Sequence, residues 1–204
     1  MKTRIVIASS NNGKLAEFRD LLTDTDWECI PQQELGVSDA DETGLSFIEN
    51  AILKARHAAQ VTGLPAIADD SGLCVEALDF RPGLYSARFA GEHGNAQANM
   101  TKLRELLRAT PTDAPFSAFY ISAIAMVRSA DDPAPIVTEG RWYGEVIDDQ
   151  RGQGGFGYDP MFLDPRFGQT AAELDSAFKN GISHRGIAMR KLHERLRAPD
   201  LLAD

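Results

Sequence analysis

Residues 116–127 place the strongest constraint on the fold. This segment holds aromatic, β-branched and other apolar side chains, and it contains no glycine, proline or charged residue. Such a run predicts the central strand of a sheet. Residues 137–147 have a similar pattern and are its best candidate partner. The chain is therefore expected to build its core around a sheet.

The rest of the chain mixes short strand patterns with helical ones. Ser46 and Glu49 form a capping box before apolar residues at helical spacing, which predicts a helix over residues 47–61. Other helices are expected at 14–22, 97–108 and from Ser183 to about residue 196, and strands at 4–8, 27–30 and 65–69. This mixture predicts an α/β fold with a mixed sheet flanked by helices. We interpret residues 1–204 as a single domain, with two lobes around a central cleft inferred from loop placement.

Composition excludes some classes of protein, but it does not indicate a particular function. The net charge of −9 argues against a general nucleic-acid binder, although magnesium can neutralise a small phosphorylated ligand locally. No apolar run reaches the roughly 20 residues of a membrane span, and the N-terminal run is too short for a signal peptide. We therefore expect no membrane partner and a cytoplasmic location. Cys29 and Cys74 are expected to be reduced.

A polar loop between the first strand and helix is a candidate phosphate site. A strand-to-helix junction presents free backbone amides and a positive helix end to phosphate oxygens, and a lysine adds charge. The alternative is a cluster of helix N-cap residues. The loop lacks the first glycine of a Walker A motif. Its residues are Ser9, Ser10, Asn11, Asn12, Gly13 and Lys14.

Carboxylates at two places are candidate magnesium ligands. Asp39, Asp41 and Glu42 precede the capped helix, and Asp69 and Asp70 end a predicted strand that runs into a polar turn with Ser71 and Gly72. Magnesium prefers such oxygen ligands and often shares them with substrate phosphates. The alternative for the first group is a solvated acidic loop. Neighbouring strand residues face opposite sides, so only one of Asp69 and Asp70 is expected to face a ligand. Asn50 and Lys54 share one helix face and can both point at that ligand. The alternative for Lys54 is a solvated surface lysine.

Two later stretches are candidates for binding a base. Phe156, Tyr158 and Asp159 lie among glycines, where they can stack on a base and bond its edge, or else form a turn with its aromatics in the core. Lys179, His184 and Arg185 lie at or near a predicted helix start. A guanidinium only donates hydrogen bonds, so Arg185 would favour a carbonyl oxygen over an amine. The alternative is that His184 and Arg185 are surface residues.

Six stretches in this order resemble the inosine/xanthosine triphosphate pyrophosphatase family, the non-canonical purine nucleotide pyrophosphatases. The likeness spans nearly the whole chain. The stretches are Ser9–Lys14 with Glu17, Glu42–Ala55, Ala68–Leu73, Pro82–Arg88, Gly155–Pro160 and Ser183–Arg185.

The resemblance implies a magnesium-dependent homodimer with an elongated, two-lobed α/β fold. Its activity would convert ITP, dITP or XTP to the monophosphate and pyrophosphate by attack at the α-phosphorus. Glu42 and Asp70 would bind the metal, and Asp70 would also activate the attacking water. The other implied roles are phosphate binding by residues 9–14 with Lys54, substrate contact by Ser71, a base and sugar pocket from Phe156, Gly157, Tyr158 and Asp159, and reading of the purine edge by Lys179, His184 and Arg185.

Two rival functions fit parts of this pattern. A septum-inhibition-type nucleotide pyrophosphatase is related in fold, but the stretches at 156–159 and 183–185 argue against it. A regulatory nucleotide-binding module without turnover would not need Glu42, Asp70 and two candidate lysines together. We therefore expect an enzyme.

Overall fold

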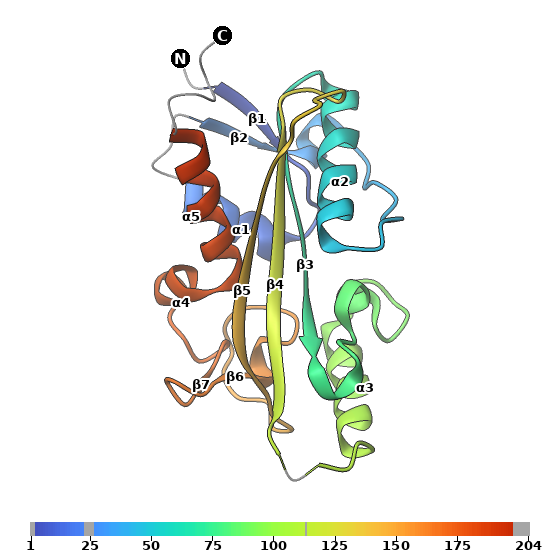
Figure 1. The fold of residues 1–204 in the computed structure, drawn as a ribbon, viewed down its shortest axis with the longest axis vertical. Helices are drawn as coiled ribbons and strands as arrows, with labels where there is room; N and C mark the ends of the chain where they lie inside the picture. The colour runs from blue at the N-terminus through green and yellow to red at the C-terminus, as the bar shows by residue number, and fades with distance from the viewer. Residues whose placement is uncertain (1–2, 23–26, 113, 198–204) are drawn as a thin grey trace. The chain divides into compact units, whose positions relative to one another are not determined.

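The computed structural model describes residues 3–22, 27–112 and 114–197, and its strands form one seven-stranded sheet (Figure 1). The sheet order is β2-β1-β3-β4-β5-β6-β7. β1 pairs in parallel with β2 and β3, whereas β6 pairs antiparallel with β5 and β7. The predicted mixed sheet is confirmed. The strands are β1 (Thr3–Ile7), β2 (Trp27–Pro31), β3 (Ala66–Val75), β4 (Phe116–Val127), β5 (Ile136–Val146), β6 (Phe162–Asp164) and β7 (Gln169–Thr170).

The four predicted helices are present, each starting within about two residues of the expected position. α2 begins as its capping box predicts, because the Ser46 side chain accepts a hydrogen bond from the Glu49 amide. Gly63 ends α2 in the left-handed conformation that favours glycine. A short additional helix, α4, follows the N-cap Asp175 and was not predicted. The α-helices are α1 (Asn12–Leu22), α2 (Phe47–Thr62), α3 (Ala96–Arg108), α4 (Ser176–Ile182) and α5 (His184–Arg197).

The predicted turn at residues 69–72 is wrong, because β3 continues through it to Val75. Polar residues favour turns when their side chains need local partners. Here the carboxylates of Asp69 and Asp70 are bonded by side chains from other elements instead. The backbone therefore keeps its extended form, and the two carboxylates have different sets of partners.

The chain divides into two compact units, with β3, β4 and β5 contributing residues to both. Unit 1 contains the described parts of Met1–Asp70, Ser122–Gly140 and Arg185–Asp204, and unit 2 contains Ser71–Ile121 and Arg141–His184. The predicted single domain with two lobes and a cleft stays a prediction. No helix among the described residues combines the length and hydropathy of a membrane span.

In unit 1, the two faces of the sheet carry side chains of different size. Small residues such as Ala66, Ala68 and Ala123 pack with the alanines of α2, whereas Ile67 and Ile124 pack with α1 and α5 on the opposite face. Figure 1 shows α2 on one side of these strands and α1 and α5 on the other. The small face lets α2 lie close to the strands.

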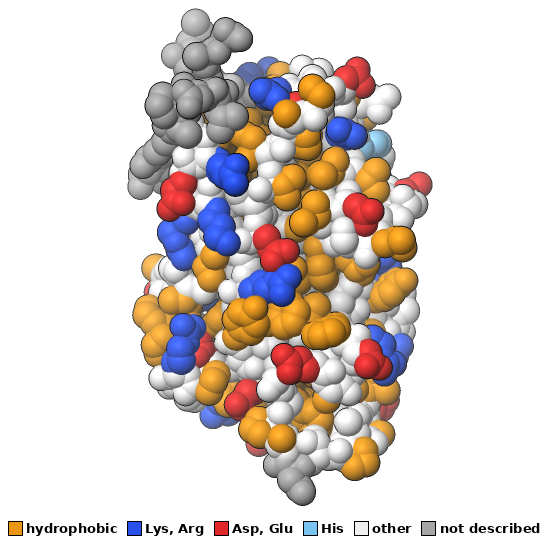
Figure 2. Space-filling view, in the orientation of Figure 1, with side chains coloured by type: hydrophobic (Ala, Val, Ile, Leu, Met, Phe, Trp, Pro, Cys, Tyr) orange, Lys and Arg blue, Asp and Glu red, His pale blue; other side chains and the backbone are white. Residues whose placement is uncertain are grey.

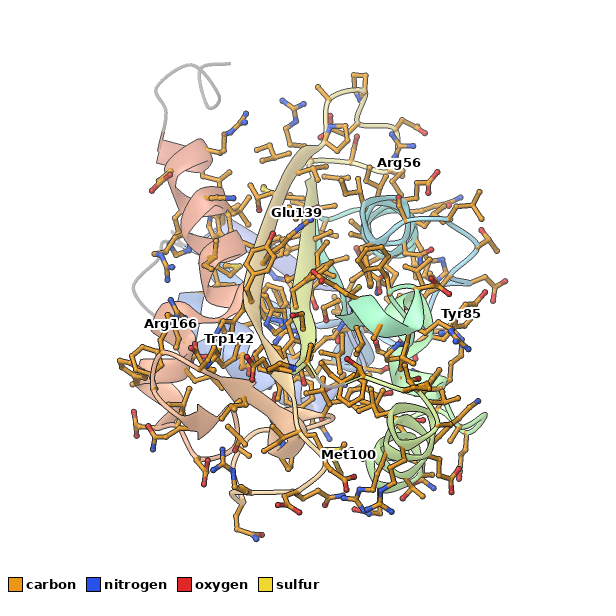
Figure 3. All side chains as sticks on the ribbon, turned by 60° about the horizontal axis from the view of Figure 1, so that its bottom comes forward. Arg56, Tyr85, Met100, Glu139, Trp142 and Arg166 are labelled. Atoms are coloured by element: carbon orange, nitrogen blue, oxygen red, sulfur yellow. The ribbon has the colours of Figure 1, made fainter. Side chains whose placement is uncertain are left out.

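Unit 2 has its own core, which contains aromatic side chains and lies beside the buried carboxylate of Asp164. Trp142 and Phe162 stack edge to face at 5.0 Å between ring centroids. The Trp142 indole nitrogen donates to Asp164 at 2.7 Å, and the Arg166 guanidinium pairs with the same carboxylate at 2.6 Å. Figure 3 labels Trp142 and Arg166. These partners permit Asp164 to be fully buried beside the core.

The close contact at α2 predicts that Ala55→Leu destabilises the protein. Ala55 has no exposed surface, so a larger side chain must displace its neighbours, at a cost of about 1–3 kcal/mol. Gln60→Leu on the exposed face of α2 is the control and should change the free energy of unfolding by less than about 0.5 kcal/mol. Urea unfolding followed by circular dichroism measures both. Equal stability of the two variants would contradict close packing at Ala55.

Candidate functional site

A buried charge network centres on Asp69. Its carboxylate accepts hydrogen bonds from Ser122 of β4 and from Arg185 of α5, the latter at 3.1 Å, and it pairs with Lys14 of α1 at 2.9 Å. Arg185 also pairs with Glu17 of α1. Asp69 and Arg185 are each 1% exposed. Because water does not reach them, each charge is stabilised by its oppositely charged partner.

Burial and opposite charges compete in setting the pKa values of Asp69 and Lys14. Burial alone would raise the pKa of Asp69, but Arg185 and Lys14 outweigh burial and hold the pKa well below its usual range. Burial lowers the pKa of Lys14, with further lowering from Lys54 and Arg185, although Asp69 opposes the change. Asp69 is therefore a fixed negative charge at neutral pH.

The second cluster of unit 1 forms around Lys54 of α2. The Lys54 ammonium group pairs with Asp70 at 2.7 Å and with Glu42 at 3.0 Å. Burial lowers the pKa of Lys54, but Asp70 and Glu42 outweigh it and raise the pKa above its ordinary value. Glu42 and Asp70, predicted as metal ligands, thus converge on one cation. Among the described residues, no group of three or more His, Cys, Asp or Glu side chains forms a metal site.

Asn50 holds the turn that carries Glu42 against α2. Its side-chain oxygen accepts from the Gly44 amide at 2.8 Å, and its amide nitrogen donates to Asp70 at 3.3 Å. A side chain at Gly44 would place its Cβ 2.6 Å from that of Glu49, so the turn requires glycine. Asn50 and Lys54 share one helix face, as predicted, and both contact Asp70.

The loop of residues 9–14 is shaped by its own hydrogen bonds. Asn11 accepts the Lys14 amide on its side chain at 3.1 Å and the Leu15 amide on its carbonyl at 2.9 Å, which makes it the N-cap of α1. Ser10 donates to Asp39 at 2.8 Å. Asn12 and Gly13 lie in the first turn of α1, where backbone amides point along the helix axis. The alternative reading of this loop, a helix N-cap, is thus observed, and phosphate binding stays a prediction.

In unit 2, Asp159 organises the glycine-rich loop. Its carboxylate accepts from the Phe156 amide at 2.9 Å and pairs with Lys179 of α4 at 2.7 Å. The Lys179 ammonium also lies 5.3 Å from the centroid of the Phe156 ring. Gly155 has a φ of +68°, and a Cβ there would overlap the Asp159 carboxylate, so glycine is required. Phe156 and Asp159 of the loop thus form one cluster with Lys179, which lies 20 positions after Asp159.

Three other predicted site residues have observed structural partners. Tyr158 is buried, and its hydroxyl donates to the Ser86 carbonyl at 2.9 Å. The His184 ring stacks on Tyr120 with centroids 4.8 Å apart and an interplanar angle of 12°. Arg185 and His184 are buried, so their reading as surface residues is wrong. Gly157 has a φ of +64°, and Ser71 lies inside β3.

Sequence reasoning did not find the partners of Asp69. Ser122 stands in the otherwise apolar centre of β4, and a lone hydroxyl in a central strand was a usable signal. Glu17 belonged to the motif of the first stretch but received no role. The Arg185 contact with Asp69 links residues 116 positions apart, so spacing alone did not indicate it.

The chain belongs to the Ham1 family, whose model matches residues 5–195. A protein of Xanthomonas oryzae pv. oryzae named dITP/XTP pyrophosphatase is 52% identical over 197 residues, which cover 97% of this chain and 98% of that relative. The solved structure of a HAM1 protein from Coxiella burnetii has a TM-score of 0.88 and 48% identity, and covers 95% of this chain and 98% of its own. The Staphylococcus aureus Ham1 structure has a TM-score of 0.82 and 40% identity, with coverage of 95% and 98%.

The charge network predicts that Asp69→Asn destabilises the protein by about 3–5 kcal/mol at pH 7, because Lys14 would lose its buried counter-charge and Arg185 would keep only Glu17. The Asp69 pKa is lower in the folded state, so its stabilisation is present above the unfolded value of about 3.9 and is lost as pH falls through the folded pKa. Asp69→Asn should therefore reduce the loss of stability in acid. Urea unfolding at pH 7 and at lower pH measures both effects.

Asp148→Asn is the matched control for that prediction. Asp148 pairs with Arg104 and Arg108 at the surface, where water screens ion pairs and they contribute little to stability. An Asp69→Asn loss no larger than that of Asp148→Asn would contradict the central role of the buried carboxylate.

Proposed function

We propose that this protein hydrolyses non-canonical purine nucleoside triphosphates (ITP, dITP and XTP) to the nucleoside monophosphate and pyrophosphate. The observation that supports it most is the convergence of Glu42 and Asp70 on Lys54 in a chain of the Ham1 family. Carboxylates that already surround one cation suit a metal-assisted reaction of a phosphorylated substrate. The relatives named dITP/XTP pyrophosphatase support the choice of base.

Glu42 and Asp70 fit a magnesium ion as carboxylate ligands, with substrate phosphates and water supplying the other oxygens. Magnesium would neutralise the charge that develops on the phosphate oxygens. Asp70 would also accept a proton from the water that attacks the α-phosphorus. Asn50, which donates to the Asp70 carboxylate, would fix its orientation for that step.

The lysines would hold the leaving pyrophosphate. Lys14 and Lys54 are largely buried, so their charges are little screened by water. Ser9, Ser10 and the amides of the first turn of α1 would bind phosphate oxygens, as helix N-termini do. Ser71, next to Asp70 in β3, would contact the substrate.

In unit 2, Phe156 would stack on the base, and Asp159 with Lys179 would bond its polar edge. Lys179 donates only, so it favours the carbonyl oxygen at C6 over an amine. His184 and Arg185 are proposed readers of the same edge; Arg185 would then exchange contacts with Asp69 or Glu17 for the base. Gly157 and Tyr158 would shape the pocket through the loop backbone and its anchor to Ser86.

We further propose that the enzyme acts as a homodimer on the cytoplasmic nucleotide pool, as the family resemblance implies. This pool contains the free triphosphates on which the reaction depends.

The proposed reaction predicts pyrophosphate release from ITP, dITP and XTP with magnesium, and little release without it. ATP should react more slowly, because a donor facing an amine is left unpaired at a cost of about 1–3 kcal/mol, or about 5- to 150-fold in rate. A coupled pyrophosphate assay over this panel measures both. Orthophosphate as the first product, or equal rates on ITP and ATP, would refute the proposal.

Replacing Asp70 should separate chemistry from binding. Asp70→Asn removes a proton acceptor of nearly the same shape, so kcat should fall by about 10²- to 10⁴-fold. Binding of a non-hydrolysable ITP analogue, measured by calorimetry, should persist. Asp79→Asn is the matched control, because Asp79 is exposed and its left-handed backbone suits asparagine. Turnover of Asp70→Asn equal to this control would exclude the proposed role.

A further inference from the structure

The stretch Pro82–Arg88, one of the six that carry the family resemblance, is not used by the proposed reaction. Most of it forms a 3₁₀ helix in unit 2, η3 (Gly83–Arg88). The Arg88 guanidinium lies 5.4 Å from the centroid of the exposed Tyr85 ring. Exposed hydrophobic side chains stand among charged ones over much of the visible surface of unit 2 (Figure 2), so this pair alone does not indicate a site. The contacts of Ser86 are more informative, because they join separate parts of the unit.

The Ser86 hydroxyl completes the hydrogen bonding of β3. It accepts from the Leu73 amide at 3.0 Å and donates to the Gly83 carbonyl at 2.6 Å. The segment before η3 borders β3 as well, since the Val75 amide donates to the Arg81 carbonyl at 3.3 Å. Leu73 has no exposed surface, so water cannot replace the hydroxyl as the partner of its amide. Ser86 therefore fixes this part of β3.

The Ser86 carbonyl connects η3 to the glycine-rich loop. It accepts from the Tyr158 hydroxyl at 2.9 Å and from the side-chain nitrogen of Asn99 on α3 at 3.3 Å. Burial raises the pKa of Tyr158, so its hydroxyl stays protonated at neutral pH and can donate. Asn99 also donates to the Ala87 carbonyl at 3.2 Å, which fixes η3 to α3. The loop is thus attached to a well-held backbone carbonyl.

Both ends of this link lie next to residues that are proposed to bind the substrate. Ser71 stands two positions before Leu73 in β3, and Asp159 directly follows Tyr158 in the loop. Ser86 therefore joins the strand that carries Ser71 to the loop that carries Asp159. Precise placement matters here, because a displacement of about 1 Å is enough to weaken a substrate contact severely.

We propose that Ser86 is a positioning residue of the base pocket, which holds the glycine-rich loop in place against β3. The inference rests on the proposed function and deepens it, because it gives the stretch at 82–88 a part in base recognition. Ser86 acts through its carbonyl on Tyr158 and through its hydroxyl on Leu73. Its loss should weaken binding of the base and spare binding of the phosphates, whose proposed lysine ligands Lys14 and Lys54 belong to unit 1.

Two probes separate a positioning role from general damage. Inosine monophosphate carries the base, whereas inorganic tripolyphosphate offers phosphates alone. Ser86→Ala removes the partner of the buried Leu73 amide, so the dissociation constant of inosine monophosphate should rise about 10-fold or more. The dissociation constant of tripolyphosphate should change less than about twofold. Calorimetry with magnesium present measures both constants.

Matched variants serve as controls. Ser86→Thr keeps a hydroxyl that can donate and accept, so it should bind both probes as the unchanged protein does. Ser117→Ala makes the same chemical change at an exposed serine of unit 2 and should also leave both constants unchanged. If Ser86→Ala fails to fold, Tyr158→Phe replaces it, because it removes only the hydroxyl that donates to Ser86. The same selective loss of inosine monophosphate is expected.

Equal weakening of both probes would show a purely structural role for Ser86 and overturn the proposal. Unchanged binding of inosine monophosphate to the variant, or no binding to the unchanged protein, also overturns it. Pyrophosphate release from ITP is measured on the same samples. A selective loss of inosine monophosphate in a protein that releases no pyrophosphate contradicts the proposed reaction alone. Turnover of ITP without any selective loss in the variant contradicts the role of Ser86 alone.

Discussion

The Asp69 carboxylate holds unit 1 together where four elements meet. It lies on β3 and accepts hydrogen bonds or ion pairs from Lys14 of α1, Ser122 of β4 and Arg185 of α5. Two buried cations would be costly without it, and a buried carboxylate would be equally costly without them. The start of α1, which carries the candidate phosphate loop, and the start of α5 are thereby fixed to the central strands.

This anchoring also orients the proposed chemistry. Asp69 and Asp70 are neighbours in an extended strand, so their side chains leave on opposite sides. The strong partners of Asp69 fix the strand, and Asp70 meets Lys54 and Asn50 of α2. Asp69 thus supplies a fixed structural charge, and Asp70 supplies the carboxylate that we propose takes part in the reaction. The alanines of α2 also help to position Lys54, because their close packing against the strands sets the distance from Lys54 to Asp70.

Local patterns in the sequence were sufficient to predict the main elements. The run at 116–127, the capping box at Ser46 and the shared face of Asn50 and Lys54 were all confirmed. The turn after Asp69 was wrong, because its stabilising partners come from elements far away in sequence. The burial of Arg185 was missed for the same reason. Side chains that satisfy one another across a fold leave little local signal, whereas periodicity and capping are local by nature.

In the proposed reaction, water activated beside Asp70 attacks the α-phosphorus. Hydrolysis of ITP in water enriched in oxygen-18 tests it most directly, because the label marks the phosphorus that was attacked. Mass spectrometry of the products should find the label in inosine monophosphate and none in pyrophosphate. Label in pyrophosphate would place the attack at the β-phosphorus and contradict the account.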